Sequence, residues 1–143
     1  MTACVLDASV AVKWFLPPAQ ETLTEEALRL LENYANGDMS LVVPDLFWPE
    51  IGNIFWKAIR LRRISRESAE SALVALEEQR ITTVPTSPLL KDAFAIAATF
   101  DRTVYDSTYV ALSIASNVPL ITADERLANA LGTRFSVRWL GSF

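Results

Sequence analysis

Five short runs of strand-forming residues are separated by helical patterns, and this alternation constrains the fold more than any other feature of the chain. The runs cover residues 3–6, 40–43, 81–84, 120–122 and 135–140. Neighbouring parallel strands need a long crossover connection, usually a helix, so strands that alternate with helices predict a parallel sheet. We therefore predict an α/β fold, a three-layer α/β/α sandwich around a central, mostly parallel sheet of about five strands.

Helical signals fill the segments between these runs. Helices are predicted over residues 9–15, 22–36, 48–63, 65–79, 87–100, 106–116 and 125–131. Thr22 and Glu25 have the spacing of a capping box at the start of the second helix, and Ser65 is placed to cap the fourth. No linker or low-complexity segment interrupts the pattern, so residues 1–143 are expected to form one domain.

Four acidic residues stand where an apolar run gives way to a predicted helix: Asp7, Glu50, Asp106 and Asp124. In a parallel α/β sheet, the ends of the strands and the starts of their helices share one edge, where ligands bind. Four carboxylates gathered at one edge repel one another unless a cation lies between them. Their joint position therefore indicates a divalent metal site.

Helix capping is the alternative explanation for these acids. Aspartate is a favoured N-cap, and Asp7, Asp106 and Asp124 each stand immediately before a predicted helix. Glu50 lies in the first turn of a predicted helix, where a negative charge is favourable against the helix dipole. Capping accounts for each residue taken singly, whereas the shared edge favours the metal site.

Composition removes several other kinds of chemistry. The chain has no histidine, and its one cysteine, Cys4, lies within a predicted strand. Sites of the Ser-His-Asp and Cys-His types are excluded, and a structural zinc site is not expected. The sequence also lacks the glycine-rich motifs that cradle nucleotide phosphates. Hydrolysis by this chain would therefore depend on carboxylates and metal.

No apolar run approaches the roughly 20 residues needed to cross a bilayer. The N-terminus lacks a basic region, and Asp7 and Lys13 interrupt its apolar stretch, which is unlike a signal peptide. We therefore expect a cytoplasmic protein that makes no membrane contact.

The sequence around each acid resembles a motif of the PIN-domain ribonucleases. The four motifs, in the order of the family, match Val5–Ser9, Pro49–Asn53, Tyr105–Leu112 and Leu120–Leu127. Order, spacing and total length agree, and the resemblance covers essentially the whole chain. The branch that the chain resembles most is the VapC-like toxins of prokaryotic type II toxin–antitoxin systems.

This resemblance implies a metal-dependent endoribonuclease, in which a metal-activated water hydrolyses RNA phosphodiester bonds. Mg²⁺ prefers oxygen ligands and keeps several waters, and Mn²⁺ also suits an oxygen-rich site. Asp7 and Asp124 are expected as inner ligands of one or two such ions. Asp106 and Glu50 are expected to orient water. A cognate small antitoxin protein and a second copy of the chain, in a homodimer, are the partners that the resemblance implies.

Ser9, Asn53 and Thr122 are secondary candidates, because each lies close to one of the acids in the sequence. The hydroxyls of Ser9 and Thr122 could bind metal-bound water or a phosphate. Alternatively, Ser9 caps the first helix and Thr122 simply suits a strand. Asn53 lies one helical turn after Glu50 and either orients it or is a surface amide.

Charge gives a mixed indication about nucleic acid. The formal net charge of −4 has the wrong sign for binding RNA by bulk electrostatics. Five cations nevertheless fall within ten residues: Lys57, Arg60, Arg62, Arg63 and Arg66. They either form a phosphate-contacting patch or supply the positive charge that suits the C-terminus of a helix.

Two other functional classes fit parts of the pattern. A receiver-like phospho-signalling domain has similar length and alternation, but it needs a phosphoacceptor aspartate after a central strand and a lysine after a later one. Asp45 is close to such a position, yet no lysine follows the late strands. A non-catalytic interaction module, in which the acids serve only as caps, is the other alternative. Metal-dependent cleavage of RNA would separate the nuclease from both.

Overall fold

A five-stranded sheet forms the centre of the computed structural model, which describes residues 2–143. Its strands are β1 (Thr2–Leu6), β2 (Met39–Pro44), β3 (Thr82–Val84), β4 (Leu120–Thr122) and β5 (Val137–Trp139). Each neighbouring pair in the order β3-β2-β1-β4-β5 is parallel. The predicted sheet is confirmed, and it is parallel throughout the described residues rather than mostly parallel.

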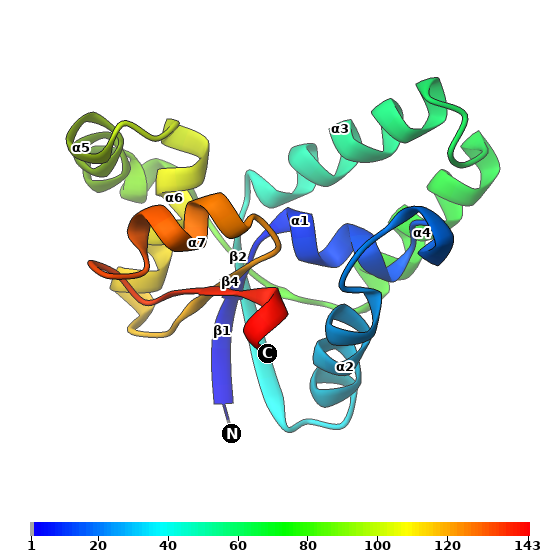
Figure 1. Cartoon of the computed structure of the whole chain (residues 1–143), viewed down its shortest axis with the longest axis horizontal. Coiled ribbons are helices and arrows are strands. Elements are labelled where there is room, and N and C mark those ends of the chain that lie inside the picture. The colour runs from blue at the N-terminus through cyan, green and yellow to red at the C-terminus, as the bar shows by residue number, and fades with distance from the viewer. Residues whose placement is uncertain (1) are drawn as a thin grey trace.

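Helices cover both faces of this sheet. They are α1 (Ala8–Ala11), α2 (Thr24–Ala35), α3 (Phe47–Arg60), α4 (Arg66–Glu78), α5 (Leu90–Phe100), α6 (Val104–Ser116) and α7 (Glu125–Leu131). Figure 1 shows α1, α2 and α4 on one side of the sheet and α5, α6 and α7 on the other, while α3 packs against α1 and α4. None of the helices formed by residues 2–143 has the length and apolar character needed to cross a membrane.

Right-handed crossovers explain this division into layers. The chain steps from β1 to β2 and β3 in one direction, then returns past β1 to β4 and β5 in the other. Because parallel connections are right-handed, the reversal moves the later helices to the opposite face. The predicted three-layer sandwich is confirmed.

The strand order also decides between two of the functional classes. Receiver-like and other flavodoxin-like sheets have the order 2-1-3-4-5, with the third strand in the middle. Here β1 is the central strand, and β2 and β4 lie on its two sides. The receiver-like alternative is therefore wrong.

The hydrophobic core is built around β1 and α6. Cys4, Val5 and Leu6 are almost completely buried, as expected for a central strand with helices on both faces. Helix α6 packs against β1, β2 and β4, and its residues 107–113 are all buried. This packing fixes the residues that follow β1 and β4.

Helix ends follow the sequence signals only in part. Ser65 caps α4 as predicted, accepting a hydrogen bond from the Ser68 N–H at 3.1 Å. The capping box at Thr22 is wrong: α2 begins at Thr24, after Leu23 in a left-handed conformation with φ 59°. Leu23 is partly buried against the core, so tertiary packing sets the start of this helix. Helix α3 ends at Arg60, before the predicted residue 63, because Arg62 turns the chain with φ 56°.

Candidate active site

The reversal of the chain at β1 creates a crevice at the carboxyl ends of β1 and β4. In open α/β sheets, ligands bind in the crevice where the strand order reverses. Leu6 and Ile121 are paired in the two strands, so both strands end at the same level. Asp7 directly follows β1, and Asp124 lies two residues after β4. The fold therefore places two of the predicted acids at its natural ligand site.

Asp7 is held rigidly at this edge. It is 9% exposed, and its N–H donates to the Ile121 carbonyl at 3.1 Å, which extends the ladder between the strands. One carboxylate oxygen, Oδ2, accepts from the Thr122 hydroxyl at 2.7 Å and from the Ser9 hydroxyl at 3.0 Å. Asp7 occupies the N-cap position of α1, but its side chain makes no cap hydrogen bond of good geometry and is held instead by these two hydroxyls.

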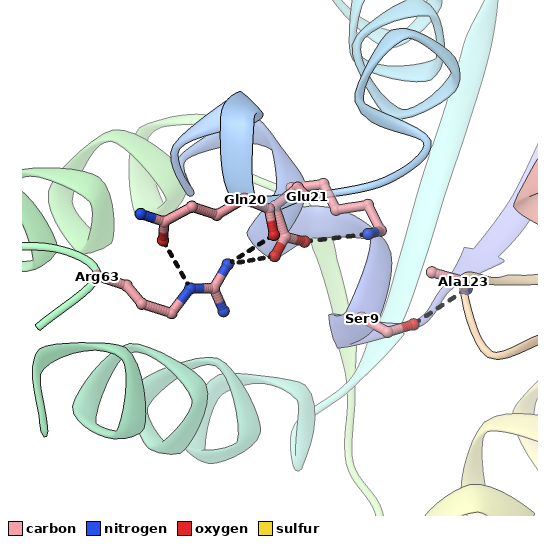
Figure 2. Close-up of polar contacts among 6 residues, drawn as sticks. Ser9, Gln20, Glu21, Arg63 and Ala123 are labelled. Carbon is pink, nitrogen blue, oxygen red and sulfur yellow. Dashed lines mark hydrogen bonds and ion pairs between the residues drawn. The ribbon is translucent and has the colours of Figure 1, made fainter. Parts of the chain in front are cut away.

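The same two hydroxyls connect the ends of β1 and β4. Thr122 is fully buried, and its oxygen also accepts from the Asp124 N–H at 3.1 Å. The Ser9 hydroxyl accepts from the Ala123 N–H at 3.1 Å, a contact drawn in Figure 2. Both side chains therefore hold Asp7, Thr122 also contacts the Asp124 backbone, and the interpretation of Ser9 as a cap of the first helix is wrong.

We expect Thr122→Val to weaken Mn²⁺ binding about 10- to 100-fold, the usual effect of losing a group that orients a metal ligand. Valine keeps the shape of threonine but removes the hydroxyl that holds Asp7 and the Asp124 N–H. Calorimetric titration with Mn²⁺ measures the change. Thr108→Val is the matched control, because the hydroxyl of this buried threonine donates to the Val104 carbonyl within α6. Equal losses in the two variants would contradict this role for Thr122.

Glu50 and Asp106 reach the crevice from two different helices. Glu50 lies in the first turn of α3, and Asp106 lies in the first turn of α6. Both line one cavity of about 560 Å³. Asp106 is not the cap of α6, because the Thr103 hydroxyl takes that role by accepting from the Asp106 N–H at 3.0 Å. Capping is therefore the wrong explanation for Asp106.

Asp124 does cap its helix. Its Oδ1 accepts from the N–H groups of Arg126 and Leu127 at 3.0 and 3.2 Å, at the start of α7. These bonds use one of the two carboxylate oxygens, and the side chain is exposed. The capping explanation is confirmed here, and the second oxygen makes no cap hydrogen bond.

Electrostatic repulsion links the four acids. Burial raises the pKa of Asp7, and the charge of Asp106 raises it further. Burial and the charges of Asp7 and Asp106 raise the pKa of Glu50 to about 7. Burial also raises the pKa of Asp106; the Arg102 cation lowers it, and the charge of Asp124 raises it. The charge of a neighbouring acid therefore contributes to the raised pKa of Asp7, of Glu50 and of Asp106.

The donor set suits a sparsely coordinated Mg²⁺ or Mn²⁺ ion. Among residues 2–143, no three acidic side chains lie close enough together to enclose an ion by themselves. Mg²⁺ usually keeps several waters and binds through one or two carboxylates and substrate phosphates, so it needs no such cage. Glu50 Oε1 is buried beside the Tyr109 hydroxyl, and neither atom makes a hydrogen bond of good geometry, a cost that a cation or water at the cavity would relieve. The four acids therefore fit a Mg²⁺ or Mn²⁺ ion that keeps several water ligands.

Two further residues at the site were not among the candidates predicted from the sequence. Tyr109 is 2% exposed, and its hydroxyl is buried beside the Glu50 carboxylate. Burial and the charges of Asp7 and Glu50 raise the pKa of this phenol. Arg102 is the cation that lowers the pKa of Asp106. Tyr109 lies within the motif match Tyr105–Leu112, the signal that could have indicated it, whereas nothing in the sequence singles out Arg102.

Asn53 lies at the rim of the site rather than at its centre. It is exposed on α3, one turn after Glu50, and lines the same cavity. No hydrogen bond joins it to Glu50 within the described residues. Asn53 also lines a second cavity, of about 420 Å³, together with Lys57 and Arg60. The two cavities therefore adjoin at this residue.

The predicted basic cluster divides into two groups. Arg63 donates to Glu21 and Gln20, and Glu21 also pairs with the buried Lys13 at 3.0 Å, so Arg63 belongs to the ion network in Figure 2. Arg66 pairs with Glu70 along α4 at 2.6 Å.

The remaining cations lie at or after the end of α3. Lys57 and Arg60 line the second cavity, where the Arg60 guanidinium stacks 5.0 Å from the centre of the Trp56 ring. Arg62 is exposed in the turn after α3 and lines neither cavity. Lys57 and Arg60 are therefore the members of the cluster whose cavity adjoins the acidic site.

Comparisons with known proteins identify the family of this chain. The PIN domain family model matches residues 4–131. Ribonuclease VapC1 of Mycobacterium tuberculosis is 34% identical over 132 residues, which are 92% of this chain and 93% of the relative. Ribonuclease VapC3 of Pyrobaculum aerophilum is 29% identical over 126 residues, 87% of this chain and 91% of the relative.

Solved structures share the fold at lower sequence identity. PAE2754 from Pyrobaculum aerophilum has a TM-score of 0.67 at 20% identity, over 99% of this chain and 85% of its own. VapBC2 from Rickettsia felis, solved bound to promoter DNA, has a TM-score of 0.65 at 12% identity, over 96% and 98% of the two chains. The sequence matches confirm the resemblance seen in the four motifs, and the chain belongs to the PIN-domain family and, within it, to the VapC branch.

Proposed function

We propose that the protein is a cytoplasmic, Mg²⁺- or Mn²⁺-dependent endoribonuclease and the toxin of a toxin–antitoxin pair. The observation that carries this proposal is the group of mutually repelling acids at the reversal point of the sheet: Asp7, Glu50, Asp106 and Asp124. The VapC relatives are named ribonucleases, which supports RNA as the substrate. Purified protein should cleave total RNA in the presence of Mg²⁺ and lose this activity in a chelator.

Each acid has a distinct task in this proposal. Asp7, fixed through Oδ2 by two hydroxyls, is a preorganised metal ligand. Asp124 offers the oxygen that makes no cap hydrogen bond. The chemistry supplied by the bound ion is polarisation of the scissile phosphate and activation of a water. Glu50 has a pKa of about 7, which suits it to orient that water and accept its proton. Asp106 orients water from the α6 side of the cavity.

Substrate binding must rely on local positive charge, because the chain as a whole is acidic. Lys57 and Arg60 are exposed on the helix that carries Glu50, and they line the cavity that adjoins the acidic site. We assign these two residues to the RNA phosphates beyond the cut. Arg63 and Arg66 already have carboxylate partners and contribute less.

Replacing Lys57 and Arg60 together with glutamine should weaken RNA binding and flatten its dependence on salt. Each phosphate contact with a single strand contributes about 0.7 to the slope of log K against log salt, so the slope should fall by about 1.4. Fluorescence anisotropy with labelled single-stranded RNA at several salt concentrations measures it. Arg66→Gln is the control, since Arg66 pairs with Glu70 and lies outside both cavities. An unchanged slope in the double variant would mean that Lys57 and Arg60 do not contact the RNA phosphates and only supply positive charge at the solvated end of α3.

The proposed partners are a small antitoxin and a second copy of the chain. Two structurally similar proteins come from toxin–antitoxin complexes, of Klebsiella pneumoniae and Rickettsia felis. Exposed apolar side chains at the start of α5 and near the end of α6, Leu90 and Ile114, offer surface for such contacts. A short reading frame for a small DNA-binding protein directly before this gene would support the antitoxin. Light scattering on the purified chain would test the homodimer.

A further inference from the structure

The cavity shared by Glu50 and Asp106 has walls that metal chemistry does not need. Leu46, Pro49 and Ile54 contribute apolar surface along α3 and the residue before it. A site that held only an ion and water would be lined by polar groups. An apolar-walled cavity of about 560 Å³ with a few polar groups is instead typical of a site for an organic group.

Tyr105 stands on the other wall of this cavity, next to Asp106 in the chain. Its side chain is 68% exposed, more than any other large hydrophobic side chain of the described residues. Aromatic rings left open beside a nucleic-acid path serve as platforms on which unpaired bases stack. Tyr105 is therefore placed to receive a planar group that enters the cavity.

Asn53 adds a polar group to the same cavity. An amide offers both donors and an acceptor, the combination that reads the edge of a base. Asn53 also borders the second cavity, where Lys57 and Arg60 lie. A nucleotide chain that follows α3 would thus pass from these cations to the acids, with a base beside the cavity.

We propose that this cavity binds one unstacked nucleobase of the RNA, next to the phosphate that is cut. The inference rests on the proposed ribonuclease function and deepens it. A base must leave its stack to enter such a cavity, and this costs least at an unpaired nucleotide, so an unpaired base at the cut is favoured. The base stacks on Tyr105, and Asn53 contacts its edge. Selectivity for the nucleotide at this position would follow from these two contacts.

Cleavage kinetics on two matched single-stranded RNAs, one intact and one lacking a single base, test whether that base stacks on Tyr105. The cut in a single-stranded RNA is mapped first, and the flanking nucleotides are then replaced one at a time by an abasic residue. At one position the abasic residue should lower kcat/KM of the wild type about 5- to 100-fold. Tyr105→Ala should cause the same loss on intact RNA and no further loss on that abasic RNA. Tyr105→Phe should keep wild-type rates, because the ring remains.

Phe94→Ala is the matched control, since Phe94 is an aromatic residue that is 62% exposed on α5 and does not line the cavity. It should behave as the wild type on both substrates. Independent, additive losses from Tyr105→Ala and from the abasic residue would overturn the base site. So would a Tyr105→Ala variant that changes only oligomeric state or binding to a protein partner.

A binding measurement tests the proposed base site without requiring RNA cleavage. Single-stranded RNA carrying 2-aminopurine is titrated in Mg²⁺ with Asp7→Asn protein, which should bind without cutting. Its fluorescence should be quenched on stacking, and the quenching should disappear with Tyr105→Ala but persist with Phe94→Ala. Quenching without any cleavage by the wild type would refute the ribonuclease while supporting the base site. Absence of quenching at every labelled position would overturn the base site.

Discussion

Asp7→Asn protein should lose RNA cleavage by about a thousandfold or more, because several kcal/mol of transition-state stabilisation depend on the bound ion. Oδ2 of Asp7 accepts two hydrogen bonds from hydroxyls, so the amide oxygen of asparagine must take that place. The NH₂ group then replaces Oδ1. An NH₂ group is a hydrogen-bond donor and cannot ligate a cation. The rate on a single-stranded RNA oligonucleotide, measured in Mg²⁺, is the readout.

The same variant should remain folded. Burial raises the pKa of Asp7, so the folded protein binds a proton there more tightly than the unfolded chain does. The free energy of unfolding of the metal-free protein therefore falls as pH rises from the ordinary aspartate range through this raised pKa. Asparagine is uncharged throughout, so Asp7→Asn should melt at or above the temperature of the wild type in EDTA at neutral pH. Thermal melting followed by circular dichroism measures this.

Asp45→Asn is the control for both measurements. Asp45 also follows a strand of the sheet, but its carboxylate accepts from the Thr86 N–H and hydroxyl, away from the acidic group. This variant should cleave RNA at the rate of the wild type. Full cleavage by Asp7→Asn, or equal loss in both variants, would contradict the role given to Asp7.

Chelation of divalent cations should stop cleavage, and added Mg²⁺ or Mn²⁺ should restore it with an affinity that rises with pH up to about 7. Glu50 has a pKa of about 7, raised chiefly by burial and then by the charges of Asp7 and Asp106. Below this pH a proton must leave Glu50 before its carboxylate can face a cation, so protons compete with the ion. For one displaced proton, the affinity falls by up to about tenfold per pH unit.

Calorimetric titrations with Mn²⁺ between pH 6 and pH 8 test this dependence. Glu50→Gln should bind more weakly, and its affinity should change less with pH, since glutamine has no proton to lose. Glu67→Gln, at an exposed acid in the first turn of α4, should match the wild type. A steep pH dependence that survives Glu50→Gln would assign the competing proton to another group.

The acids at the ends of β1 and β4 were predictable because local signals place them. Apolar runs define both strands, and a parallel sheet brings their ends together. The capping roles were not predictable in the same way. Thr103, Asp106 and Asp124 all carry oxygens suited to an N-cap, and only the folded backbone shows that Thr103 caps α6 while Asp124 caps α7. Single-residue preferences could not choose between them.

Contacts between distant residues were beyond the sequence. Thr122 meets Asp7 across 115 positions, and Arg63 meets Glu21 across 42. Tyr109 reads as one apolar residue among the buried positions of α6, yet packing brings its hydroxyl beside Glu50. These side chains are selected by tertiary packing, which leaves no trace in helix periodicity or in the spacing of acids.

The position of a bound ion tests the central claim most directly. Anomalous scattering from Mn²⁺ in crystals of the wild-type protein should give a peak at the carboxyl ends of β1 and β4, beside Asp7, and no peak there in the Asp7→Asn variant. An ion bound elsewhere, or RNA cleavage by protein that holds no ion at this edge, would contradict the claim.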